Sequence, residues 1–424
     1  MSSDISAKRG RERFRQAWLL AVWFAVHNAS RACADIAPAP LSGGKSLEIK
    51  GNAKTNVAMV DEVVKLKLSR DACHVDVVFT MKNTDAKYET MQVGFPHYYP
   101  DELKDFKAAV NDKPVVVKTA AESETTSSPD FPEIKGQRRI YWKTWEMTFA
   151  PEAPVKIAVS YSTKLRKGST IWREGSTWMV DMNSISNHLT ELAAKDDQPA
   201  LQKQLVSGDV TYILRSGSHW SGPIGRCRIE VTFDGMTTDN LTLGSPHFEQ
   251  AAATITRDKI TWDLKDYEPK QDVYLTFTPE ITRAATLKLL ERFQKQHPHD
   301  PGISGVLFEY LIAAKRQPEA DALMLELLKH WQDKIAIWGP ESERGQSLRH
   351  SAEVFSMIHR RIDKERKPLE FQNPSQLAPV IERIALRVQD QLKFVPPNQA
   401  DRTKHYVEQI DKMLEWSKTH AKPE

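Results

Sequence analysis

Residues 73–81 read CHVDVVFTM, and every second side chain in this run is apolar. A period of two predicts a β-strand with one face packed and the other in water. Residues 227–233 (CRIEVTF) repeat the pattern, and shorter alternating runs occur at 64–68, 157–161 and 273–277. Turn residues such as those at 111–114 separate these runs at short intervals, so we expect an antiparallel β-sandwich-like domain.

The apolar period changes to three or four after residue 279, which indicates helices. Thr278 can cap the first helix, and Asp300 and Gln317, each followed by proline, predict two later helix starts. The segment 280–424 is therefore expected to be an all-α C-terminal domain of helical hairpins or a bundle. A repeat solenoid is the alternative, although the residues typical of the common helical repeats are absent.

Two segments interrupt the β pattern of residues 35–279. Residues 119–132 are rich in Ser, Thr, Glu and Pro without an apolar period, and predict a mobile loop. Residues 184–204 place three leucines among alanines and charges, which is typical of short helix and loop.

The first 34 residues are typical of a secretory signal peptide. Five basic residues between positions 8 and 15 precede an apolar run at 17–26, and Ala32, Cys33 and Ala34 form a small-residue cleavage site. An apolar run this short predicts no membrane-spanning helix, and we expect none after signal removal. We therefore expect an exported protein, periplasmic or extracellular.

The net charge supports no nucleic-acid partner. Removing residues 1–34 takes six Lys/Arg and two Asp/Glu from the 59 and 56 of the whole chain, and leaves 53 and 54. A nearly neutral mature chain carries no basic footprint for nucleic acid.

Cys73 and Cys227 are the two cysteines outside the signal peptide. An oxidising compartment would allow one disulfide between them if their strands are neighbours. Two separate buried thiols are the alternative, because both cysteines fall on the apolar side of a strand.

Motifs for catalysis or cofactor binding are incomplete in this sequence. Residues 43–46 (GGKS) resemble the end of a phosphate-binding loop, but position 39 is alanine. Residues 297–300 (HPHD) could offer metal ligands, yet they lie where one helix ends, so Asp300 is interpreted as a helix cap. No G-x-S-x-G or H-E-x-x-H pattern occurs, and we predict no catalytic, cofactor or metal site.

Tryptophans are concentrated in the β region, and three of them are candidates for stacking on a ligand: Trp142, Trp172 and Trp220. Alternation places Trp142 on the polar face of its strand, where an indole could stack on a sugar ring or anchor a partner. Packing in the core or between domains is the alternative for all three.

Five short motifs occur in order across the β region: those at 59–64, 79–84, 93–96, 105–106 and 212–225, the last reading YILRSGSHWSGPIG. Together they resemble the exported bacterial proteins catalogued as domain of unknown function four-four-two-four, over about residues 41–278. The resemblance implies an exported β-sandwich-like protein. That family has no assigned reaction, so it implies no functional residues.

We therefore expect a non-enzymatic binding or structural module of the cell envelope, whose partner is an unknown protein or a cell-envelope glycan. One alternative is a carbohydrate or cell-wall binding protein that uses exposed tryptophans. The other is a hydrolase whose catalytic residues come together only in the fold, without a local motif.

Overall fold

The computed structural model describes residues 32–34, 37–38, 55–97, 103–128, 131–167, 182–335, 354, 358, 371, 373–393 and 400–421. The chain divides into two compact units. Residues 1–174 and 206–280 form the first, called the β unit here, and residues 175–205 and 281–424 form the second, the helical unit.

The strands of the β unit make three sheets. An eight-stranded sheet has the order β14-β15-β13-β3-β4-β10-β6-β7, a four-stranded sheet the order β2-β5-β9-β8, and a third joins β1, β11 and β16 to β12. Their bounds are β1 Ala32–Ala34, β2 Ala37–Pro38, β3 Val57–Leu68, β4 Ala72–Asn83, β5 Glu89–His97, β6 Lys104–Val110, β7 Lys113–Pro114, β8 Lys118–Ser128, β9 Phe131–Phe149, β10 Pro154–Lys164, β11 Arg166–Lys167, β12 Gly208–Ile213, β13 Ile224–Phe233, β14 Thr254–Ile255, β15 Lys259–Tyr267 and β16 Val273–Phe277.

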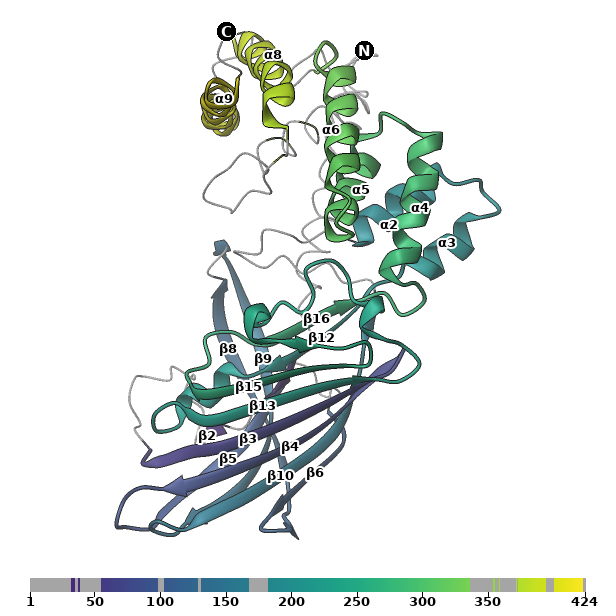
Figure 1. Ribbon diagram of the computed structural model, residues 1–424. Helices are drawn as coiled ribbons and strands as arrows, with labels where there is room; N and C mark the ends of the chain where they lie inside the picture. Colours follow the sequence, from purple (N-terminus) through teal and green to yellow (C-terminus); the bar gives the residue numbers. More distant parts are fainter. Residues whose placement is uncertain are drawn as a thin grey trace, which may run out of the picture. The chain divides into compact units, whose positions relative to one another are not determined.

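The eight-stranded sheet is mostly antiparallel, and its long strands lie side by side in Figure 1. The pair β3–β13 is parallel, as is β1–β12 in the third sheet. Strand β1 ends at the predicted cleavage site, so cleavage there would remove it from β12.

Aromatic side chains fill the space between the eight-stranded sheet and the sheet of β2, β5, β9 and β8. The ring of Phe95 on β5 lies 6.1 Å from Phe79 on β4 and 5.7 Å from Phe106 on β6, centroid to centroid. Tyr161 on β10 lies edge-on to Phe95 at 6.1 Å. These contacts join the inner faces of two sheets, so the predicted sandwich-like β region followed by helices is confirmed.

The segment 119–132 is not the loop that its composition predicted. Strands β8 and β9 pair through it, from Lys118 with Thr144 to Ser128 with Phe131. Backbone hydrogen bonds form an antiparallel hairpin there without an alternating apolar pattern, and threonine is itself favoured in strands.

The helical unit contains α2 Met182–Leu192, α3 Gln198–Leu205, α4 Arg283–Gln296, α5 Pro301–Ala313, α6 Gln317–Trp331, α8 Pro374–Leu392 and α9 Ala400–His420. Figure 1 shows α2 and α3 in teal beside the green helices α4 and α5, although about 75 residues of chain separate them. The sequence reading assigned residues 184–204 to helix and loop within the β domain. In the structure these helices belong to the helical unit, where α2 packs against α5 and α3 packs against α2.

Helix starts follow the predicted proline positions. Asp300 caps α5 and Pro301 is its first residue, while α6 begins at Gln317. The predicted cap Thr278 is wrong, because Thr282 caps α4 by accepting a hydrogen bond from the amide of Ala285. The Thr278 hydroxyl instead donates to the carbonyl of Asn240 within the β unit.

Candidate functional site

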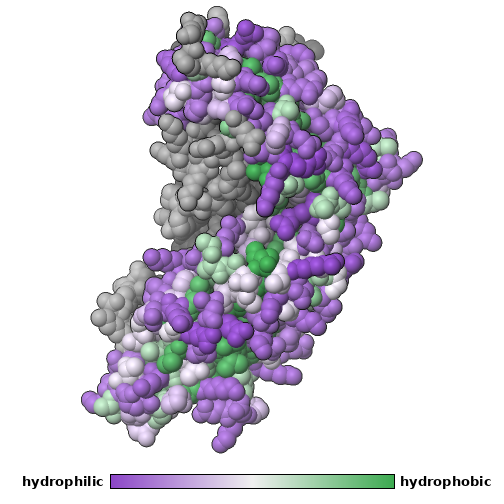
Figure 2. All heavy atoms as spheres, viewed as in Figure 1, coloured by the Kyte–Doolittle hydropathy of each residue, from purple (hydrophilic) through white to green (hydrophobic). Residues whose placement is uncertain are grey.

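An open groove of about 650 Å³ lies along β4, β10 and β6. Val78, Ala158 and Ala109 form an apolar row in it, because Val78 pairs with Ala158 and Ala158 pairs with Ala109. Pro114 extends this row beside Ala109. Val78 and Ala158 lie on the face of the sheet away from the core, since both neighbours of each along its strand are buried. On the face presented in Figure 2, hydrophobic side chains interrupt a largely hydrophilic surface over the β unit.

Basic side chains border the groove on one side. The next cross-strand rows on this face contain Lys65, Asp76, Ser160 and Lys107, and then Lys67, His74, Ser162 and Lys104. Lys67 is paired with Asp234 at 3.1 Å, and His74 lies 3.3 Å from Asp76. Among the described residues, no acidic group lies within ion-pair distance of Lys65, Lys104 or Lys107. The border of the groove therefore carries an excess of positive charge.

The volume of the groove falls within the range of small-molecule sites. Pockets that hold such ligands have volumes of roughly 300–1,000 Å³ and combine apolar walls with a few polar groups. Asp76 is the one carboxylate among the lining residues described. This arrangement favours an apolar ligand that carries an acidic group.

Glu62 on β3 is the second unusual group of the β unit, and its side chain is fully buried. Its Oε1 accepts a hydrogen bond from the Tyr212 hydroxyl at 3.0 Å, and its Oε2 accepts one from the Cys227 thiol at 3.6 Å. Burial raises the pKa of Glu62 to about 7, although both hydrogen bonds oppose this rise. Sequence reasoning missed this residue.

The disulfide that the sequence allowed between Cys73 and Cys227 is not formed, and the alternative of two separate buried thiols holds. Cys73 on β4 pairs with Leu68 of β3, whereas Cys227 on β13 pairs with Glu62, which is also on β3. The two thiols are therefore separated by one strand and six residues along it, about 20 Å. Disulfides require Cα atoms within about 7 Å of each other. Burial raises the pKa of Cys73 to about 12, so this thiol stays protonated.

Trp142 and Trp220 are both buried, with 7% and 4% of their surfaces exposed. Trp220 packs edge-on against Phe149 in the core, at 6.3 Å between ring centroids. The predicted position of Trp142 on a solvated face is wrong, because the indole lies over Gly94 of the neighbouring strand β5. Neither ring presents an open face for stacking on a sugar. Trp172 lies outside the described residues.

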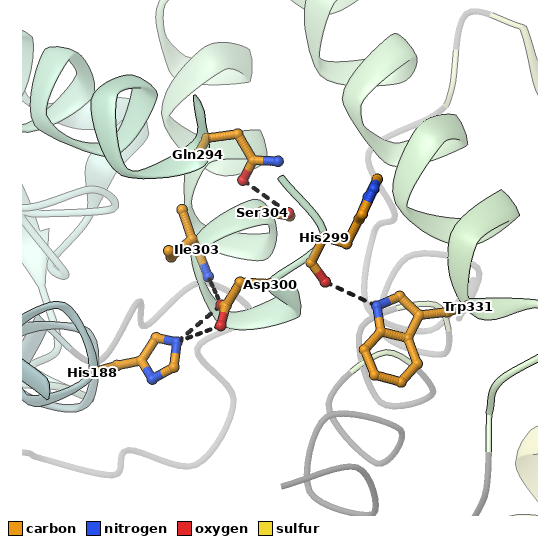
Figure 3. A network of polar contacts seen from close by, with 7 residues as sticks. All are labelled: His188, Gln294, His299, Asp300, Ile303, Ser304 and Trp331. Atoms are coloured by element: carbon orange, nitrogen blue, oxygen red, sulfur yellow. Dashed lines mark hydrogen bonds and ion pairs between the residues drawn. The ribbon is translucent and has the colours of Figure 1, made fainter. Parts of the chain in front are cut away.

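The HPHD motif lies between α4 and α5 in the helical unit, and Figure 3 shows its surroundings. Asp300 Oδ1 accepts a hydrogen bond from the amide of Ile303 at 2.8 Å, which confirms its role as a cap. Both of its oxygens also lie 2.9 Å from Nε2 of His188 on α2. Asp300 thus joins α2 to α5.

His299 points the other way, toward α6. Its carbonyl accepts a hydrogen bond from the Trp331 indole at 3.0 Å, and its ring stacks on His330 at 3.7 Å between centroids. Burial, the neighbouring His299 and Lys334 together hold the pKa of His330 below its usual range. Within the described part of the chain, no three His, Cys, Asp or Glu side chains are grouped as metal ligands would be.

Asp300→Ala is expected to destabilise the helical unit by about 2 kcal/mol, because it removes a helix cap and the acidic partner of His188. Asp300→Asn keeps a capping side chain and should cost less. Hydrogen–deuterium exchange of α5 and α2 peptides would measure both losses. Asp333→Ala, at an exposed aspartate of the same unit, is the control. Equal protection in Asp300→Ala and Asp333→Ala would contradict the structural role.

Comparison with protein families confirms the resemblance drawn from the sequence: residues 137–275 match the domain of unknown function DUF4424. The match does not reach the motifs at 59–106. No curated protein matches the chain. Among the described residues, none of the helices is long and apolar enough to cross a membrane.

Two solved structures show distant similarity to this chain. A Legionella pneumophila protein, provisionally described as nutrient binding, is 18% identical with a TM-score of 0.40, and the alignment covers 77% of this chain and 97% of that one. An M1 zinc metallopeptidase from Deinococcus radiodurans is 8% identical with a TM-score of 0.19, over 87% and 95% of the two chains. At these values the alignments imply no shared activity.

Proposed function

We propose that this protein is an exported, non-catalytic binding protein of the cell envelope. Its β unit holds a small amphiphilic ligand in the groove along β4, β10 and β6, with the acidic group of the ligand beside Lys107. The observation that carries this proposal is the apolar row of Val78, Ala158 and Ala109 beside lysines that have no acidic partner among the described residues.

Two kinds of interaction would hold such a ligand. Covering the apolar row releases water from it, which contributes roughly 25 cal/mol for each Å² buried. The acidic group would form a charge-assisted hydrogen bond with the Lys107 ammonium, and such bonds are about twice as strong as neutral ones. A glycan bound by tryptophan stacking is less well supported, because Trp142 and Trp220 are buried.

Export is part of the proposal and rests on the signal-like segment 1–34. Fractionation of cells that express the full chain would test it. The expected result is a mature protein in the envelope or the medium whose first residue is Asp35. An uncleaved chain in the cytoplasm would contradict export without affecting the groove.

Calorimetric titration of the full chain with decanoate is the direct test of binding. Decyl maltoside and decyltrimethylammonium carry the same alkyl chain with a neutral and a cationic head. Decanoate should bind at least tenfold more tightly than the cationic amphiphile. Lys107→Glu should reverse that preference. The proposal would be overturned if the affinities of the three amphiphiles did not depend on head-group charge, or if none of the three bound.

Ala158→Glu is expected to abolish decanoate binding, because it places a carboxylate in the apolar row where it repels the ligand. Thr232→Glu is the matched control, since Thr232 on β13 is also half-buried and lies in the same sheet outside the groove. Cooperative urea unfolding of both variants would show that the sheet is intact. Equal decanoate affinity in Ala158→Glu and the parent protein would place the ligand elsewhere.

A further inference from the structure

Glu62 joins strands of two different sheets within the β unit. The carboxyl belongs to β3 of the eight-stranded sheet, while the Tyr212 hydroxyl that it binds belongs to β12 of the third sheet. Cys227, its other partner, lies directly opposite on β13. The side chain is therefore a polar connection beside the hydrophobic core residues of the β unit.

The described residues around Glu62 offer no counter-charge. On β4 the opposite residue is Phe79, whose ring packs against Phe95 of the facing sheet. The titratable groups that face the carboxyl are Tyr212 from β12 and Cys227 from β13, and Asp61 on its own strand adds a repulsive negative charge. Within the described residues, no cation contributes. An ionised Glu62 would keep its hydrogen bonds but remain an unpaired buried charge, which is costly.

We propose that Glu62 is a proton-operated latch of the β unit. The neutral acid connects β3 to β12 and β13 and stabilises the packing of the sheets. When its proton passes to water, the uncompensated carboxylate weakens that packing and favours opening of β3 and β13. The β unit thereby responds to pH near neutrality, and this response does not depend on a ligand in the groove.

The direction of the effect follows from linkage. The pKa of Glu62 is about 7 in the folded protein against 4.5 for an ordinary glutamate, so the folded state holds the proton more tightly. The stabilisation is fully present below pH 4.5, and it is lost as pH rises through 7. Between pH 5 and 8.5 the unfolding equilibrium constant should therefore rise by on the order of 10²-fold from this group alone.

Hydrogen–deuterium exchange of β3 and β13 in the full chain tests the latch. Glu62→Gln keeps the shape of the side chain but cannot ionise. At pH 8.5 the amides of β3 and β13 should therefore be better protected in Glu62→Gln than in the parent, and the difference should disappear toward pH 5. Comparison at equal pH cancels the intrinsic exchange rates. Glu230→Gln is the control, because Glu230 lies on β13 with its side chain paired to Lys259. It should follow the parent at both pH values.

Two further measurements keep the proposal falsifiable if Glu62→Gln folds poorly. Tyr212→Phe removes a hydrogen bond that lowers the pKa of Glu62, so the pH transition should move upward. Infrared difference spectra should show a protonated carboxylic acid at pH 6 that is lost by pH 8.5. Parallel pH profiles for the parent and Glu62→Gln, an unmoved transition in Tyr212→Phe, or no such infrared band would each overturn the latch.

Discussion

Replacing Trp142 by alanine should destabilise the β unit by about 3 kcal/mol. The indole is 7% exposed, and it covers Gly94, whose added Cβ would lie only 3.2 Å from the ring. Truncating a buried tryptophan removes its apolar surface from the packed interior and leaves a cavity, which costs about 3–5 kcal/mol. The lower end applies because Trp142 lies outside the main core between the sheets.

Urea unfolding, followed by exchange of β5 and β9 peptides, would measure this loss. Tyr88→Ala is the control, because Tyr88 is 73% exposed just before β5. Its free energy of unfolding should change by less than about 0.5 kcal/mol. If Trp142→Ala kept full stability but lost affinity for cell-wall glycans, the result would support stacking of Trp142 on a sugar and reject its packing role.

The strands themselves were predictable, because alternation is a local property of the chain. The environment of Trp142 was not. The exposure of the Trp142 side chain depends on Gly94 of β5. Gly94 pairs with Thr144, two residues after Trp142, and lies about 50 residues earlier in the chain. Gly94 lies diagonally across from Trp142 and leaves room for the ring against the sheet, so a position on the polar side of the pattern becomes buried.

The burial of Glu62 could be predicted from the sequence, but its partners could not. Counting back in twos from Leu68 through Leu66 and Val64 reaches Glu62 on the apolar side of the strand. Its partners could not be read in the same way, since Tyr212 and Cys227 lie 150 and 165 residues further along the chain. Strand order decides such contacts, and it depends on the whole fold.

In the helical unit, too, local features could be predicted and contacts between distant residues could not. The cap at Asp300 was predicted correctly, because a capping acid before proline is a local pattern. Its ion pair with His188 joins residues 112 positions apart. The groove also escaped prediction, since its apolar row takes one residue from each of several strands.

Gly225→Ala is expected to destabilise the β unit by about 2–3 kcal/mol. Gly225 lies at the start of β13, beside a bulge of β3 in which Val60 interrupts the pairing between Met59 and Asp61. A Cβ at Gly225 would stand 2.6 Å from the Val60 carbonyl oxygen. A backbone carbonyl cannot rotate away as a side chain can, so the strands must separate, and such overpacking costs typically 1–3 kcal/mol.

The sign of this effect is informative, because chain entropy alone predicts the opposite. Gly225 does not have a positive φ, so alanine fits its backbone conformation and would ordinarily stabilise by about 0.4–1 kcal/mol. Arg228→Ala, at an exposed site on the same strand, controls for the loss of side-chain contacts on β13. Urea unfolding distinguishes the two outcomes: a stability equal to or above the parent would mean that β13 can move away from the bulge. A loss confined to Gly225→Ala would show that the bulge of β3 fixes where β13 begins, and hence the register that sets Cys227 opposite Glu62.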